Sequence, residues 1–142
     1  MTAGYLVDTN VISELAKPSP EPAVRHWAQE ADPDSLYISV ITIGELRKGI
    51  VLHPDPVRRS RLERWKRDVL ANWFVGRILD VTDEVAERWG ELSGLCQQIG
   101  HPLPVLDLLL AATAAEHGLT VVTRNAAHFE GIGVDVLSPW PS

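Results

Sequence analysis

The stretch that decides the fold is Tyr5-Leu6-Val7-Asp8-Thr9-Asn10. Its first three residues are apolar, and a short apolar run closed by polar residues is typical of a strand buried on both faces. Asp8 stands where this strand ends, and open α/β sheets bind ligands at the carboxyl ends of their strands. Asp8 or Asn10 could instead cap the helix that follows, so both interpretations of Asp8 stay open here.

The composition is that of an ordinary globular protein. The 142 residues suffice for one domain with one core, which we expect to span residues 1–142. The only cysteine, Cys96, excludes an intramolecular disulfide and favours a reducing cytoplasm. No apolar run approaches the ~20 residues that cross a bilayer, and we expect neither a signal peptide nor a membrane partner. The net charge of −6 argues against charge-driven nucleic-acid binding, but it allows a local basic groove.

Apolar runs alternate with helical periodicity along the rest of the chain. Further strands are expected at residues 36–40, 77–81, 119–122 and 134–137. Strands that alternate with helices predict an α/β domain with a mainly parallel sheet.

Two more acids stand at expected helix starts. Thr42 and Glu45 match a capping box, with Thr at the cap and Glu three residues later, and this is the simplest account of Glu45. Asp107 is the only charge in the apolar segment 104–112, which we expect to be deeply packed. The helix dipole would stabilise an acid in the first turn. We nevertheless favour a functional role for Asp107, because a carboxylate amid so much apolar surface is costly unless paired or metal-bound.

The direction of the chain should deliver these acids to one edge of the sheet. In parallel βαβ units all strands point the same way and the helices return antiparallel to them. The carboxyl edge therefore collects Asp8, Glu45, Asp107, Thr123 and Asn125. Helix starts share this edge in any such protein, so the coincidence alone is weak support for a site.

Converging acids repel one another and need a cation. Oxygen ligands without His or Cys spacing favour Mg²⁺ or Mn²⁺ over Zn²⁺. Such a site suits phosphodiester hydrolysis, because the metal activates water and offsets charge on the phosphate.

Several other α/β enzymes are poor matches. The sequence has no GxGxxG after its first strand, no GxxxxGK[ST] and no GxSxG. An aspartyl-phosphate phosphatase would need a second acid two residues after Asp8, where Asn10 stands. A phosphotransfer or phosphatase domain acting on small phosphate esters is therefore only a third interpretation.

Basic residues gather in a helix expected near residues 59–73, namely Arg59, Arg61, Arg64, Lys66 and Arg67. They spread around its polar side among acidic residues, so a solvated face is the simplest interpretation. Contact with a polyanion or an acidic partner is the alternative.

The combination of motifs resembles the PIN-domain ribonucleases, and more narrowly the VapC and FitB toxins of bacterial toxin–antitoxin pairs. The resemblance rests on Val7-Asp8-Thr9-Asn10, Glu45, Pro-Leu-Pro-Val-Leu-Asp107 followed by Ala111-Ala112-Thr113-Ala114, and Val122-Thr123-Arg124-Asn125. It implies a three-layer α/β/α sandwich with a parallel five-stranded sheet. It also implies Mg²⁺- or Mn²⁺-dependent RNA cleavage, a homodimer, and inhibition by a small antitoxin encoded alongside.

By this resemblance, Asp8, Glu45 and Asp107 match the three carboxylates that hold the metal. Thr9, Asn10 and Thr123 would support them by holding ligands or water in place.

Many members of this family carry a fourth acid just after the fourth strand. This chain has Asn125 and His128 at the corresponding positions. Asn125 offers an oxygen without charge and would assist through water, so a tightly held second metal is in doubt.

Two functions stay open from the sequence. The first is a metal-dependent endoribonuclease acting on single-stranded or loop RNA. The second is a non-catalytic PIN-fold module that binds RNA or protein, which the missing fourth acid favours. An antitoxin segment could lie on the basic region 59–67 or across the cleft.

Overall fold

Strand β1 (Tyr5–Val7) lies at the centre of the sheet in the computed structural model, which describes residues 4–142. The order is β3-β2-β1-β4-β5, and every neighbouring pair is parallel. The other strands are β2 (Leu36–Ser39), β3 (Ile78–Leu79), β4 (Thr120–Val122) and β5 (Val136–Leu137). All five expected strands are present. However, β3 and β5 are shorter than residues 77–81 and 134–137, and Val40 begins α3 instead of ending β2.

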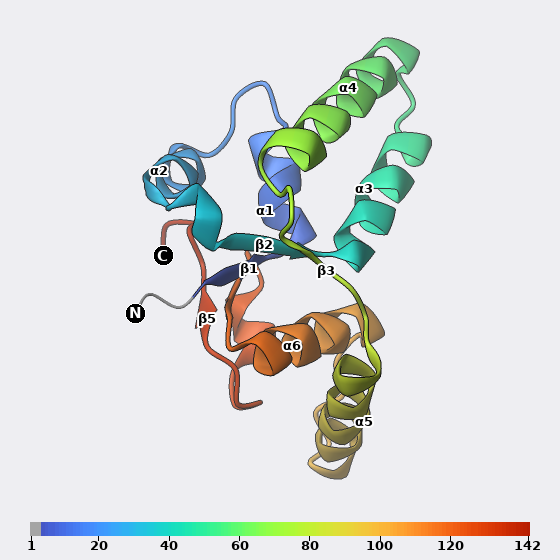
Figure 1. The fold of residues 1–142 in the computed structure, drawn as a ribbon, viewed down its shortest axis with the longest axis vertical. Coiled ribbons are helices and arrows are strands. Elements are labelled where there is room, and N and C mark those ends of the chain that lie inside the picture. Colours follow the sequence, from blue (N-terminus) through green and yellow to red (C-terminus); the bar gives the residue numbers. More distant parts are fainter. Residues whose placement is uncertain (1–3) are drawn as a thin grey trace.

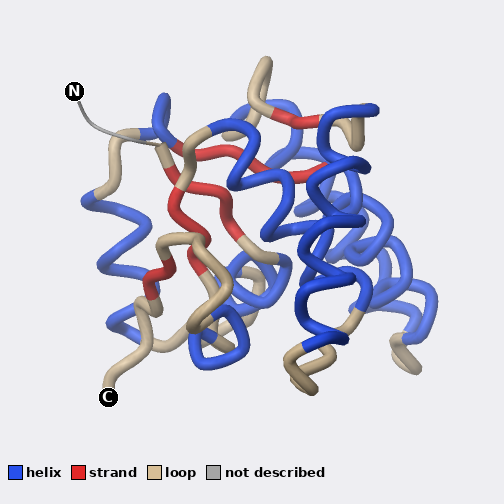
Figure 2. The backbone as a smooth tube through the Cα atoms, turned by 90° about the horizontal axis from the view of Figure 1, so that it is seen from below, coloured by secondary structure: helices blue, strands red, loops and turns tan. Residues whose placement is uncertain are grey.

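In the described part of the chain, six α-helices cover the two faces of this sheet (Figures 1 and 2). They are α1 (Thr9–Leu15), α2 (Pro22–Glu30), α3 (Val40–Leu52), α4 (Pro56–Asn72), α5 (Asp83–Gln98) and α6 (Val105–His117). Two short 3₁₀ helices, η1 (Pro33–Ser35) and η2 (Ala126–Phe129), lie in the connections. Within residues 4–142, no helix is both long and apolar enough to cross a membrane.

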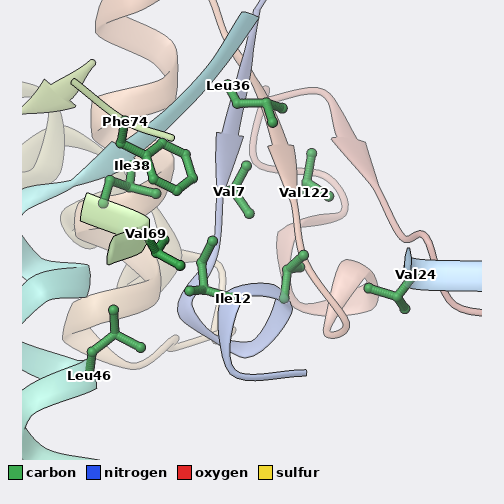
Figure 3. Packing of buried hydrophobic residues seen from close by; sticks show 10 residues of the cluster. Val7, Ile12, Val24, Leu36, Ile38, Leu46, Val69, Phe74 and Val122 are labelled. Carbon is green, nitrogen blue, oxygen red and sulfur yellow. The ribbon is translucent and has the colours of Figure 1, made fainter. Parts of the chain in front are cut away.

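The alternation of side chains along β1 divides the core into two parts. Val7 packs with residues of helices α1 to α4 in one buried cluster, shown in Figure 3. Leu6 points to the opposite face and packs with α5, α6 and the residues after β4. Successive strand residues face opposite sides, so a wholly apolar run is what a strand between two helical layers needs. The expected three-layer α/β/α sandwich is confirmed.

Helix α3 begins earlier than the capping-box interpretation required. Ser39 is the cap, because its hydroxyl accepts a hydrogen bond from the Ile41 amide at 3.1 Å. Thr42 is consequently a buried residue of the first turn, and Glu45 lies in the second turn. The capping box and the first-turn position of Glu45 are therefore wrong. The end of β2 decides which of two suitable hydroxyl residues becomes the cap.

Helix α6 is less deeply packed at its start than its composition suggests. Asp107 does lie in the first turn, but Val105 is 58% exposed and Leu106 is 43% exposed. The residues from Leu110 to Ala114 are buried instead. The expectation of deep packing therefore holds only for the second half of the apolar segment, and Asp107 stands at a boundary with solvent.

Candidate active site at the carboxyl edge of the sheet

A cleft of about 400 Å³ opens at the carboxyl edge of the sheet. Six of the seven predicted site residues line it: Asp8, Thr9, Asn10, Glu45, Asp107 and Asn125. The seventh, Thr123, is buried and contacts two of them. A smaller hollow of about 20 Å³ is also lined by all three acids. The structure thus brings the predicted residues together from four separate segments of the chain.

Asp8 is both a helix cap and a residue of the cleft. Its Oδ1 accepts a hydrogen bond from the Thr9 amide at 2.7 Å, which caps α1. Its Oδ2 accepts a second hydrogen bond from the Thr123 hydroxyl at 2.8 Å. The two interpretations left open by the sequence are therefore compatible, because one carboxylate oxygen serves the helix and the other is fixed by a distant strand end.

The surroundings of Asp8 disfavour its charge. Burial raises the pKa of Asp8 above its ordinary value, and the hydrogen bonds from Thr123 and Thr9 only partly oppose this. The negative charges of Glu45 and Asp107 raise this pKa further. A cation among the three acids would relieve both effects, since an opposite charge stabilises the ionised form.

Thr123 connects the two halves of the site. Its buried hydroxyl donates to Asp8 and accepts from Asn10 Nδ2 at 3.2 Å and from the Asn125 amide at 3.1 Å. One donated and two accepted bonds use the full capacity of a hydroxyl. Asn10 Oδ1 in turn accepts from the Arg124 amide at 3.2 Å. The start of α1 and the chain after β4 are thereby held in one hydrogen-bonded unit.

Glu45 is fixed by a threonine from another helix. The Thr9 hydroxyl donates to Glu45 Oε1 at 2.6 Å, and the buried Thr42 hydroxyl lies 3.1 Å from Thr9 Oγ1. This contact requires Glu45 to lie in the second turn of α3. From there its side chain reaches Thr9 at the start of α1 and not the cap of its own helix. The second-turn position that contradicts the capping box is thus the position that connects Glu45 to Asp8 and its neighbours.

Asp107 contacts His128, one of the two residues at the positions where many family members carry a fourth acid. Its Oδ2 lies 3.3 Å from His128 Nδ1, and its side chain is partly exposed. Asn125 contributes its backbone amide to Thr123 and also lines the cleft. His128 is therefore placed to orient Asp107, while Asn125 is placed at the cleft itself.

The donor set suits a hard divalent cation. Glu45 Oε2 and Asp107 Oδ1 accept no side-chain or amide hydrogen bond from the described residues, and carboxylate oxygens retain further lone pairs. Within residues 4–142, no three Asp, Glu, His or Cys side chains already form a group that could hold a metal ion. Mutual repulsion separates such carboxylates, so an ion would have to draw them together.

Four residues of the cleft were not predicted from the sequence, namely Ser13, Glu14, Lys17 and Arg124. Asn10, Glu14 and Lys17 follow one another at intervals of four and three, which places them on one face of a helix. Once Asn10 is assigned to the site, this spacing indicates that Glu14 and Lys17 lie beside it. Arg124 belongs to the motif Val122-Thr123-Arg124-Asn125, but nothing in the sequence shows that its side chain points into the cleft.

The chain is similar to known proteins over nearly its full length. The profile of the PIN domain family matches residues 5–133. The chain is 36% identical over 136 residues to toxin FitB of Neisseria gonorrhoeae, covering 95% of this chain and 97% of that protein. It is 34% identical over 135 residues to VapC ribonuclease Y4jK of Sinorhizobium fredii, covering 95% and 96%.

The fold agrees with a solved structure as well. The structure of FitAcB from Neisseria gonorrhoeae superposes with a TM-score of 0.91 and 33% sequence identity, covering 97% of this chain and 99% of that chain. With the family profile spanning most of the chain and two relatives matching over nearly their full length, the chain belongs to the PIN domain family.

Proposed function

We propose that residues 1–142 form a single metal-dependent endoribonuclease domain. The observation that carries the proposal is the convergence of Asp8, Glu45 and Asp107 from three separate segments on one cleft at the carboxyl edge of the sheet. Relatives that are named ribonucleases support the assignment of RNA as the substrate. Asp8, Glu45 and Asp107 would hold Mg²⁺ or Mn²⁺, the cations that prefer oxygen ligands.

The remaining residues would keep these acids in position. A bound metal would activate water and offset charge on the scissile phosphate. Thr123 holds Asp8 and Thr9 holds Glu45, each through a direct hydrogen bond. Such supporting contacts fix the orientation of a ligand and reduce its motion. Asn125, at the cleft but without charge, would orient a water molecule through its amide.

Cleavage of RNA by the purified protein tests this function. Wild type should cleave single-stranded RNA with Mg²⁺ or Mn²⁺, and EDTA should abolish the cleavage. Asp8→Asn removes the charge at nearly constant shape, so the variant should fold and lose the activity. Wild-type cleavage no greater than that of Asp8→Asn would contradict the proposal.

Metal binding can be measured without RNA. Calorimetric titration of Mn²⁺ into wild type and into Asp107→Asn should show binding that the substitution weakens or removes. Equal binding by the two proteins would remove Asp107 from the ligand set and leave it as an acid stabilised by its helix start.

The biological role we propose is that of a toxin in a type II toxin–antitoxin pair, acting in the cytoplasm. Toxin FitB is a relative, and other similar structures are described as FitAB bound to a DNA fragment and as DNA-bound VapBC from Salmonella typhimurium. A cognate antitoxin should therefore co-purify when the chain is produced with its neighbouring gene. Homodimer formation stays a prediction that light scattering would test. The free, buried Cys96 is compatible with a reducing compartment.

A non-catalytic PIN-fold binding module is the second candidate function. The observation that favours it is the uncharged Asn125 at the cleft, where many members of the family place an acid. This candidate predicts saturable RNA binding that Asp8→Asn leaves unchanged, with no cleavage at any metal concentration. Metal-dependent turnover by wild type would exclude it.

A further inference from the structure

Two cations line the same cleft as the three acids. Lys17 follows the end of α1, and Arg124 follows β4. Both residues are exposed. Their presence is unexpected beside a site proposed to hold a metal, because a nearby positive charge opposes cation binding. Both side chains are placed to meet an anion that enters the cleft.

Lys17 is held at the cleft by a buried acid. Its Nζ lies 2.9 Å from Glu14 Oε1, and Glu14 is only 6% exposed. The other oxygen of Glu14 accepts the Glu21 amide at 3.0 Å. The hydrogen bond from Lys17 lowers the pKa of Glu14, with the Glu21 amide acting in the same direction. Glu14 thus serves as a fixed, ionised anchor that restricts a side chain which would otherwise be mobile.

Arg124 is held by two different contacts. Its amide donates to Asn10 Oδ1 at 3.2 Å, which fixes its backbone against α1. Its guanidinium carbon lies 5.3 Å from the centre of the Trp140 ring, a cation–π geometry. Trp140 itself packs against the core that contains Val7 and Val122. Stacking restricts the guanidinium while leaving its N–H groups available to an anion.

Charge balance explains why the cleft needs these cations. Four carboxylates line the cleft, and Lys17 offsets the charge of one of them, Glu14. The other three carry three negative charges, so one divalent ion leaves the site negative. RNA carries a negative charge at every phosphate, and the whole chain has a net charge of −6. Binding of RNA therefore requires positive charge close to the acids. Lys17 and Arg124 are the two basic residues that line the cleft.

We propose that Lys17 and Arg124 bind the backbone phosphates that neighbour the scissile phosphate. The anionic substrate is then a nucleic-acid strand that extends beyond the cleaved bond, with the metal side of the cleft taking the reacting phosphate. Arginine suits this role because its planar group can donate two parallel hydrogen bonds to one phosphate. This inference rests on the proposed function, and its test separates the two.

RNA binding without turnover is the first test. In an Asp8→Asn background, a fluorescent single-stranded 12-mer RNA is titrated and its anisotropy is measured over a range of salt concentrations. Lys17→Gln with Arg124→Gln should raise the Kd about 10- to 100-fold. Each lost phosphate contact should lower the slope of log Kd against log salt by ~0.7, so about 1.4 in total.

A control variant with the same change in net charge isolates the effect of position. Arg25→Gln with Arg88→Gln removes two arginines from α2 and α5, neither of which lines the cleft. Its Kd and salt slope should stay close to those of the background protein. Lys17→Arg with Arg124→Lys keeps both charges and should retain most of the binding. Equal losses in the cleft and control variants, or an unchanged Kd in the cleft variant, would overturn the inference.

Turnover separates this inference from the proposed function. On an oligonucleotide, the cleft variant should raise KM by the same factor as Kd while kcat changes little. On a dinucleotide with one phosphate, the variant should lose much less activity than it loses on the oligonucleotide, because no neighbouring phosphate is present. Charge-specific RNA binding without wild-type cleavage would overturn the proposed function alone. Cleavage with unchanged KM in the variant would overturn this inference alone.

Discussion

The two ends of the sheet both carry a hollow, and the larger one lies at the amino end. That groove measures about 720 Å³ against about 400 Å³ for the cleft at the carboxyl end. Both contain several acids, and the amino-end groove also contains Tyr5, Trp27 and Tyr37. By size and aromatic content alone, the amino end would be the preferred binding site.

The acids at the two ends differ in how they are held. At the amino end, Asp32 caps η1 through the Asp34 amide, and the Asp34 side chain is 89% exposed. At the carboxyl end, Asp8 accepts hydrogen bonds from its own helix and from Thr123, 115 positions away. Partly buried polar groups that distant segments fix in place are therefore a stronger reason to propose a site than the volume of a hollow.

The largest expected effect compares one acid from each end. Asp8→Asn should lower RNA cleavage by about 10²-fold or more, since it removes a proposed metal ligand. Asp34→Asn should leave the rate within about twofold, because an exposed side chain rarely affects a distant site. Initial rates at saturating Mg²⁺ measure both. Similar rates for the two variants would eliminate the contrast between the ends.

A second pair of variants compares the two ends of strand β4. Thr123→Val removes the hydroxyl that joins Asp8, Asn10 and Asn125, and activity should fall about 10- to 100-fold. Loss of these buried bonds should also lower the free energy of unfolding by about 1–3 kcal/mol. Thr120→Val, at the amino end of β4, should change neither quantity appreciably. Urea unfolding and cleavage rates measure the pair, and equal effects would show that Thr123 has no special role.

The raised pKa of Asp8 gives a smaller, pH-dependent effect. A raised pKa means that the folded state binds the proton more tightly, so stability falls as the pH rises from the unfolded value of 3.8 through the folded pKa. Above the folded pKa and without metal, ionised Asp8 therefore costs stability. The Tm of Asp8→Asn relative to wild type should rise by about 1–4 °C as the pH increases through this range.

Bound metal should offset the cost of ionised Asp8 in wild type. Mn²⁺ should raise the Tm of wild type, because a ligand that binds the folded state stabilises it, and should have little effect on Asp8→Asn. Calorimetric scans with EDTA and with millimolar Mn²⁺ make the comparison. A Tm difference between the two proteins in EDTA that does not change with pH would contradict the cost of ionising Asp8.

The smallest effect concerns Glu14. Its pKa is lowered, so its contribution to stability is present above the unfolded value of 4.5 and is lost as the pH falls through the folded pKa. Glu14→Gln should therefore flatten the loss of Tm below about pH 4.5. Parallel acid limbs for wild type and Glu14→Gln would contradict the anchoring role of Glu14.

The sequence was sufficient for the layers of the fold and insufficient for parts of the site. The alternation of apolar strands with helices predicts the parallel sheet. The apolar run of β1 predicts that Asp8 lies at the end of that strand. Both predictions depend only on local patterns. The start of α3 could not be predicted, since Ser39 and Thr42 can each cap a helix and the end of β2 decides between them. Contacts between residues far apart in the chain carry no local signal at all.

The residues missed from the sequence illustrate this limit. The Arg124 guanidinium is oriented by stacking on Trp140, which lies after β5. Its backbone is held by a hydrogen bond to Asn10, which lies just after β1. Neither neighbour can be inferred from the motif around Arg124. Lys17 differs, because its helical spacing from Glu14 was visible and only the meaning of that pair depended on the fold.

The hydrogen-bonded unit formed by Asn10 and Thr123 has a consequence for the timing of synthesis. Residues 8–10 are synthesised more than 100 residues before their partners at 123–125. A nascent chain that ends before Thr120 already contains all three acids, yet it lacks β4, the neighbour of β1, and the hydroxyl that fixes Asp8. Translation that stops before the codon of Thr120 therefore yields a product without an assembled site.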